Sequence, residues 1–163
     1  MTGVQTCALP IWDFNWSVSY EIFVPRRSDM TLATHNGGIS ISDVSGKMDF
    51  SAMNGGVSLR RVGGNVQGST TNGGLSVELS GDHWDGEELN VRTTNGGVNM
   101  SVPENYSAHL ETGTVNGSVN VDFPVTVQGR ITKEISVNLG AGGATVRAMT
   151  TNGGIRLKRS AMN

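Results

Sequence analysis

At 163 residues the chain is long enough to form one domain with a continuous core. Only 16% of its residues are charged, against a usual value of about 25%, and its 23 glycines are about twice the average share. The net charge of −2 provides no basic field, and no apolar run approaches the roughly 20 residues of a membrane helix, so we expect neither nucleic-acid binding nor membrane insertion by this segment.

The first segment, residues 1–11, reads Met-Thr-Gly-Val-Gln-Thr-Cys-Ala-Leu-Pro-Ile. Translation of a common short-read sequencing adapter gives the same peptide, with Val in place of the start residue. We therefore interpret residues 1–11 as a sequencing artefact and exclude them from the fold. On this interpretation Cys7, the only cysteine, is not native, no disulfide supports the fold, and the native N-terminus with any export signal or anchor is missing.

Residues 12–163 are predicted to form a single domain that begins with a cap strand over residues 12–34. Apolar and polar residues alternate in its first part, which places Tyr20, Ile22 and Val24 on one face. Repeat architectures need such closing segments, because a terminal repeat has a neighbour on one side only.

The main repeats, over residues 35–130, are marked by a recurring Asn-Gly-Gly turn. The first two intervals between turns are 18 residues, and the last is 36, which is two such units. The turn residues are Asn36, Gly37, Asn54, Gly55, Asn72, Gly73, Asn95, Gly96, Asn152 and Gly153, together with Asn116 and Gly117 in an Asn-Gly-Ser variant. An Asn-Gly pair favours a turn with positive φ at two residues, and stacked Asn side chains can hydrogen-bond as a ladder. We interpret these turns as structural.

After each turn, apolar residues occupy alternate positions, which indicates short half-buried strands. Equivalent residues of successive units are expected to stack about 4.8 Å apart. Two interior ladders follow, one of Ile39, Val57, Leu75 and Val98 and one of Ile41, Leu59, Val77 and Met100. The sequence therefore predicts an all-β fold, a parallel β-solenoid with coils of about 18 residues.

One unit is longer than the others, because five extra residues fall within Gly81–Glu88. Insertions in repeat proteins map to loops and often to the binding face. An exposed Trp84, with Asp82, His83 and Asp85, is a candidate site for stacking on a sugar ring. The carboxylates of Asp82, Asp85, Glu87 and Glu88 are candidate Ca²⁺ ligands. The alternative is a solvated loop whose Trp84 folds back on the solenoid.

The C-terminal strands are predicted over residues 131–159, as a last pair at the end of the solenoid. Arg156, Lys158 and Arg159 would then place charge over the open edge, as protected sheet edges often do.

The string Thr34-His-Asn-Gly-Gly-Ile-Ser-Ile41, followed by further Thr-x-Asn-Gly-Gly units, resembles a bacterial family. It is similar to the β-strand-repeat domain of unknown function labelled "putative adhesin", which occurs in envelope-associated and secreted proteins. The resemblance covers roughly residues 18–159. It implies a parallel β-solenoid and an extracytoplasmic location, and it implies no catalytic residues.

Catalytic motifs are not recognisable in the sequence. The acids are scattered over different positions of the repeat, and His35, His83 and His109 share no motif spacing. We therefore expect a non-enzyme without cofactor, a cell-envelope or secreted adhesin-like module with a structural or surface-interaction role. Its partner would be a surface or envelope component, a glycan or a protein. The alternatives are a carbohydrate-binding or carbohydrate-active β-helix protein that uses the Asp82–Glu88 insertion, and a cytoplasmic scaffold or sensor domain cut from a longer chain.

Overall fold

A computed structural model describes residues 19–123 and 133–160, so residues 1–11 with Cys7, and the first part of the predicted cap, lie outside the described residues. Within that part of the chain every regular element is a β-strand, and no helix could span a membrane. The strands are β1 Met30–Asn36, β2 Ile39–Ser42, β3 Ser45–Asn54, β4 Val57–Arg60, β5 Gly63–Asn72, β6 Leu75–Glu78, β7 Glu88–Asn95, β8 Val98–Val102, β9 Ala108–Asn116, β10 Val119–Val121, β11 Glu134–Leu139, β12 Thr145–Asn152 and β13 Ile155–Arg159.

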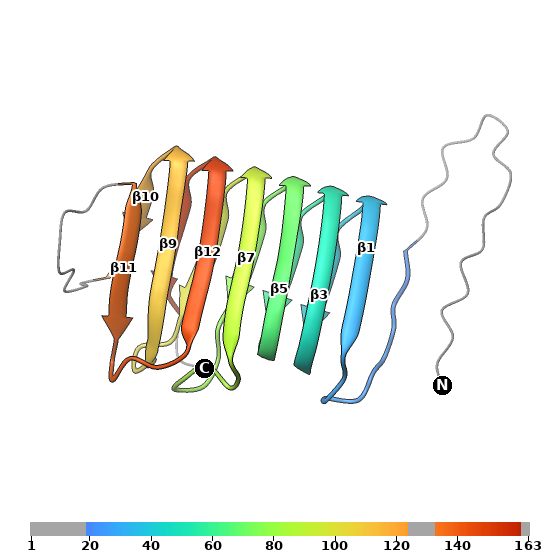
Figure 1. Ribbon diagram of the computed structural model, residues 1–163, viewed down its shortest axis with the longest axis horizontal. Helices are drawn as coiled ribbons and strands as arrows, with labels where there is room; N and C mark the ends of the chain where they lie inside the picture. The colour runs from blue at the N-terminus through green and yellow to red at the C-terminus, as the bar shows by residue number, and fades with distance from the viewer. Residues whose placement is uncertain (1–18, 124–132, 161–163) are drawn as a thin grey trace, which may run out of the picture.

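The strands form two sheets, one with the order β1-β3-β5-β7-β12-β9-β11 and the other with the order β10-β13-β8-β6-β4-β2 (Figure 1). Each coil places one strand in each sheet, and neighbouring coils pair in parallel. The exception is β11, which pairs antiparallel with β9 at the end of the first sheet. The predicted parallel β-solenoid is confirmed.

The core lies between the two sheets and is built from the alternate apolar positions of each strand. In the six-stranded sheet Val57, Leu75 and Val98 are in register, and so are Leu59, Val77 and Met100, as the period of two predicts. These six side chains are almost completely buried. No coil could bury its apolar stripe alone, so the solenoid is stable only as a stack.

The Asn-Gly-Gly corners form the predicted side-chain ladder. Each asparagine donates from Nδ2 to Oδ1 of its neighbour at 2.8–2.9 Å, in the order Asn116, Asn152, Asn95, Asn72, Asn54 and Asn36. A second ladder lies one step inward, where buried threonine hydroxyls donate to the first glycine of the adjacent turn. Because these bonds run along the axis, they hold the coils in register.

The prediction of positive φ at both turn residues is wrong for the asparagines, none of which has a positive φ, whereas the first glycine has one at Gly37 and Gly153. Among the described non-glycine residues, positive φ occurs at Asp43 and Arg61, in the opposite corner. The first glycine is required for a different reason. A Cβ on Gly73 would overlap the backbone carbonyl of Gly55 in the adjacent coil, whereas a Cβ on Gly74 would lie 3.4 Å from the nearest backbone oxygen. The close approach of stacked backbones therefore sets the motif.

The C-terminal coil does not lie at the end of the stack. Strand β12 is inserted between β7 and β9, and β13 between β8 and β10 (Figure 1). The prediction that Arg156 and Lys158 protect an edge is therefore wrong, because β13 pairs with β8 along its whole length and with β10 over Ile155–Leu157. Arg159 instead donates to the carbonyl oxygens of Pro103 and Glu104 and covers the ring of Phe123. The place of this coil in the stack therefore differs from its order in the chain.

At the other end, β1 occupies only the last part of the predicted cap. Residues 19–29 form no strand and make a single bridge, from Arg27 to Ser45. Tyr20 and Ile22, two of the residues expected on one face of this cap strand, are 80% and 71% exposed, so that face does not pack on the core.

Candidate functional site

The insertion at residues 82–88 was the strongest candidate in the sequence, and its tryptophan is not available to a ligand. Trp84 is only 4% exposed, and its indole Nε1 donates to the carbonyl oxygen of Gly64 at 3.0 Å. The loop also continues the sheet, since Gly64 N donates to the carbonyl of Asp85. The alternative, in which Trp84 folds back on the solenoid, describes the structure, and the prediction of an exposed Trp84 is wrong.

The acidic side chains of this insertion point to separate partners. Glu87 accepts from Asn65 Nδ2 at 2.8 Å, and Glu88 accepts from Gln67 Nε2 at 3.2 Å. Asp82 faces His83 Nδ1 at 2.6 Å, and this hydrogen bond lowers the pKa of the Asp82 carboxyl. Within residues 19–123 and 133–160, no three His, Cys, Asp or Glu side chains come close enough to hold a metal ion. The geometry therefore does not support the Ca²⁺ site.

Tyr106 lies near this loop, where the Ser107 amide donates to the Asp82 carbonyl. Burial raises the pKa of the Tyr106 phenol, and the Asp82 charge adds to the effect. The phenol is 2% exposed, and its oxygen has no hydrogen-bond partner among the described atoms. It remains a neutral core residue.

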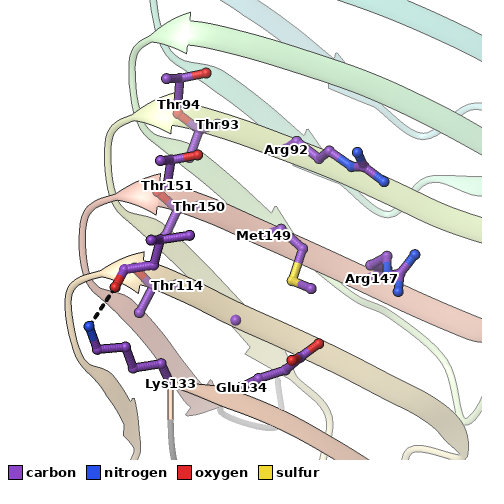
Figure 2. A pocket seen from close by; sticks show the side chains of 12 residues that line it. Arg92, Thr93, Thr94, Thr114, Lys133, Glu134, Arg147, Met149, Thr150 and Thr151 are labelled. Atoms are coloured by element: carbon purple, nitrogen blue, oxygen red, sulfur yellow. Dashed lines mark hydrogen bonds between the residues drawn. The ribbon is translucent and has the colours of Figure 1, made fainter.

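A hollow of about 670 Å³ lies on the outward face of the seven-stranded sheet, away from the insertion. Strands β7, β12, β9 and the start of β11 contribute its walls (Figure 2). Its lining residues are Arg92, Thr93, Thr94, Gly113, Thr114, Val115, Lys133, Glu134, Arg147, Met149, Thr150 and Thr151. Its volume lies in the range of small-molecule sites, although the hollow is open to solvent and not enclosed.

Gly113 is one of the lining residues, and it occupies an outward position of β9 without a side chain of its own. In register with it are Met149 on one side and Glu134 on the other. A Cβ at this position would lie 3.3 Å from Met149 Sδ and 3.3 Å from Glu134 Cγ, so the neighbours already lean over the gap. Figure 2 shows Arg92, Met149 and Glu134 following one another across the strands.

A polar network borders the hollow. His109 Nδ1 lies 2.6 Å from Asn138 Oδ1, and His109 Nε2 lies 3.3 Å from both Glu111 Oε1 and Ser136 Oγ. The second carboxylate oxygen of Glu111 lies 2.8 Å from Arg147 Nε, close enough for an ion pair although not aligned as a hydrogen bond. Asn138 and Ser136 come from the antiparallel β11, so this network exists only where β11 joins β9.

The network does not complete a site for acyl transfer. Ser136 and His109 have the residue types of a nucleophile and a base, but His109 Nε2 also faces a carboxylate. The backbone of β9 is paired on both sides, with β11 and β12, so its amides are not free to stabilise an oxyanion. What this surface offers is guanidinium and hydroxyl groups around a shallow apolar floor, which suits binding.

Comparison with known proteins gives the family. The profile of Toastrack DUF4097 matches residues 20–158, which is most of the chain. The chain belongs to this family. A crystal structure from Clostridium sporogenes ATCC 15579, described as a putative cell adhesion protein, has the same fold with a TM-score of 0.58. The two sequences are 10% identical, and the match covers 83% of this chain and 94% of the other. No curated protein matches the sequence.

The hollow of this Toastrack domain was not predicted from the sequence. One signal was present, since Gly113 is a glycine inside a strand pattern and belongs to none of the turns. A second signal was the residue type at outward positions. Arg92 and Met149 are in register with Ser69 of β5, and Arg147 is in register with the position of Gln67. Neither signal indicates that the three strands are neighbours, because that depends on the insertion of β12.

Proposed function

We propose that this chain is a non-catalytic, adhesin-like module of the cell envelope or of a secreted protein, and that it holds a surface component on the outward face of its seven-stranded sheet. The single observation that carries the proposal is the hollow over Gly113, which is lined by arginine, threonine and methionine side chains from strands fixed on both sides. Rigid paired strands position binding groups better than loops do.

Two further observations support the proposal. The structure from Clostridium sporogenes, which has this fold, is described as a putative cell adhesion protein. The outward positions are mostly uncharged and polar, as in Ser69, Asn90 and Thr94, which suits a module that presents a large surface to other macromolecules. A carbohydrate-active enzyme is not favoured, because Glu134 is the single acid among the described residues that line the hollow, and the neighbouring Glu111 is paired with Arg147.

The test is a retention assay with two matched variants. Beads coated with the protein are passed over immobilised neutral and acidic polysaccharides and over purified cell-wall sacculi. Met149→Trp fills the hollow, and Ser69→Trp places the same side chain at a register-matched outward position two strands away. We expect retention on at least one surface, a loss of about tenfold or more in Met149→Trp, and retention within about twofold of the parent in Ser69→Trp.

Three results would overturn the proposal. The first is no retention on any surface. The second is an equal loss in both tryptophan variants, which would show that the hollow is not the site. The third is release of soluble sugars from any polysaccharide, which would restore the enzyme alternative. Resequencing the locus tests the location separately, since an export signal upstream of residue 12 is expected and a cytoplasmic domain there would contradict it.

A further inference from the structure

Two arginines on neighbouring strands face the hollow. Arg92 on β7 is in register with Met149 on β12, and Arg147 lies two residues before Met149 on the same face. Such diagonal positions are about 7–8 Å apart, within reach of long side chains. Both residues line the hollow, and Figure 2 shows Arg92 on the strand next to Met149 and Arg147 further along the strand of Met149.

The two arginines are held differently, and the difference leaves donors available. Arg147 is anchored through Nε, which is shielded from solvent and lies 2.8 Å from Glu111 Oε2. Its terminal nitrogens have no hydrogen-bond or ion-pair partner among the described residues, and neither has Arg92. A guanidinium fixed through Nε presents its remaining N–H groups in a rigid fork, which matches a carboxylate.

The charges around the hollow give the ligand a direction. Lys133 is engaged with the carbonyl oxygen of Val115 at 2.7 Å, and Glu134 lies across Gly113 from Met149. A ligand carboxylate is therefore attracted to the arginine side and repelled from the Glu134 side. Thr94 and Thr151 lie at the ends of β7 and β12 with exposed side chains, whereas the hydroxyls of Thr93 and Thr150 are used inside the turn ladder.

We propose that the hollow over Gly113 binds an acidic glycan, with a uronic-acid carboxylate held between Arg92 and Arg147 and sugar hydroxyls bonded by Thr94 and Thr151. This inference rests on the proposed function and names its substrate class. A glycan is favoured over an acidic peptide because exposed hydroxyl groups flank the arginines, and the strands that carry the arginines, β7 and β12, are paired on both sides and offer an extended peptide no edge to join.

Titration calorimetry of the full chain tests the inference. The probe is trigalacturonate, and its matched control is the methyl-esterified trimer, which keeps every sugar hydroxyl and loses the negative charges. We expect the acid to bind at least about tenfold more tightly than the ester. The affinity for the acid should fall as NaCl rises, because exposed charges are screened.

Arg92→Gln should weaken trigalacturonate binding by about tenfold or more, since a charge-assisted hydrogen bond is lost. Arg156→Gln removes the same charge from the outward face of the other sheet and should leave the affinity within about twofold. Both side chains are exposed, so both variants are expected to fold, and equal thermal midpoints would verify this. Arg147→Gln is a further variant. It should also weaken trigalacturonate binding, and it removes the ion pair with Glu111 as well.

The outcomes separate the two proposals. Equal affinity for acid and ester would overturn the carboxylate site while leaving the surface-binding function intact. Equal losses in Arg92→Gln and Arg156→Gln would reduce the binding to net charge and also overturn the site. Tighter binding of poly-glutamate than of trigalacturonate would replace the glycan with an acidic peptide. If bead retention fails on all surfaces as well, the proposed function fails with the site.

Discussion

The first glycine of each turn is the position at which the stacking geometry makes its sharpest prediction. A Cβ on Gly73 would overlap the carbonyl group of Gly55 and lie 2.9 Å from the amide nitrogen of Gly56. All of these are backbone atoms, so no side chain can rotate away to relieve the contact. The two coils must separate locally at the corner.

The separation weakens bonds that the corner makes along the axis. Asn72 Nδ2 donates to Asn54 Oδ1 at 2.8 Å, Thr70 Oγ1 donates to Gly55 O at 2.8 Å, and Gly55 N donates to Asn72 O at 3.0 Å. Each such bond contributes about 0.5–1.5 kcal/mol net, and overpacking adds about 1–3 kcal/mol, so Gly73→Ala should lower the free energy of unfolding by about 2–5 kcal/mol.

Gly74→Ala is the matched control, because it places the same methyl group one residue further along. Its Cβ would lie 3.4 Å from Gly97 O, which is ordinary contact, and the change should stay within about 1 kcal/mol. Urea unfolding of both variants, followed by circular dichroism, measures the difference. Equal destabilisation by the two substitutions, or a neutral Gly73→Ala, would refute the argument that close backbone approach sets the motif.

Other predictions test the core, the insertion and the second corner. Leu75→Ala should lower the free energy of unfolding by about 2–5 kcal/mol, while outward Ser76→Ala should change it by less than about 0.5 kcal/mol in the same urea assay; similar values would mean that the faces are misassigned. Trp84→Ala should lower the free energy of unfolding by about 3–5 kcal/mol, because the indole is buried and bonded to Gly64 O. Trp84→Phe should leave the affinity for trigalacturonate unchanged, and a loss of affinity would mean that the ligand binds at the insertion. The Arg61 guanidinium lowers the pKa of the Asp43 carboxyl through paired 2.7 Å hydrogen bonds, so this carboxylate stabilises the fold above its ordinary pKa of 3.8 and the contribution is lost as the pH falls below it. The drop in urea midpoint between pH 7 and pH 3 should therefore be smaller in Asp43→Asn than in the parent. Asp49→Asn is the control, because it removes an exposed carboxylate that has no ion-pair partner among the described residues.

Local residue patterns were sufficient to predict the coil. The period of two placed Val57, Leu75 and Val98 in one buried ladder, because side chains of a strand alternate between its faces whatever the neighbouring strand is. The asparagine ladder followed for a similar reason, since stacked identical corners bring identical amides together. These features depend on one coil and its copy, and the sequence of one coil contains them.

The features that the sequence did not predict depend on which coils are neighbours. Trp84 is buried because its indole reaches the carbonyl of Gly64 in the adjacent coil, and nothing within the insertion indicates that partner. The place of β12 is a stronger case. Its Asn152 pairs as well with Asn95 as with Asn116, so the turn motif is satisfied in more than one stacking order.

The candidate site consequently depends on the order in which the coils are stacked. Arg92 lies on β7 and Gly113 on β9, which the chain contributes to the seven-stranded sheet one after the other, with β8 in the other sheet. In a sequential stack these two strands would be direct neighbours, with no methionine between them. Insertion of β12 separates them by one strand and supplies Met149 and Arg147 from a distant part of the chain. The hollow is therefore complete only when the C-terminal coil occupies its slot, and a ligand held by Arg92 and Arg147 would bind the folded stack in preference to any form in which that coil is displaced.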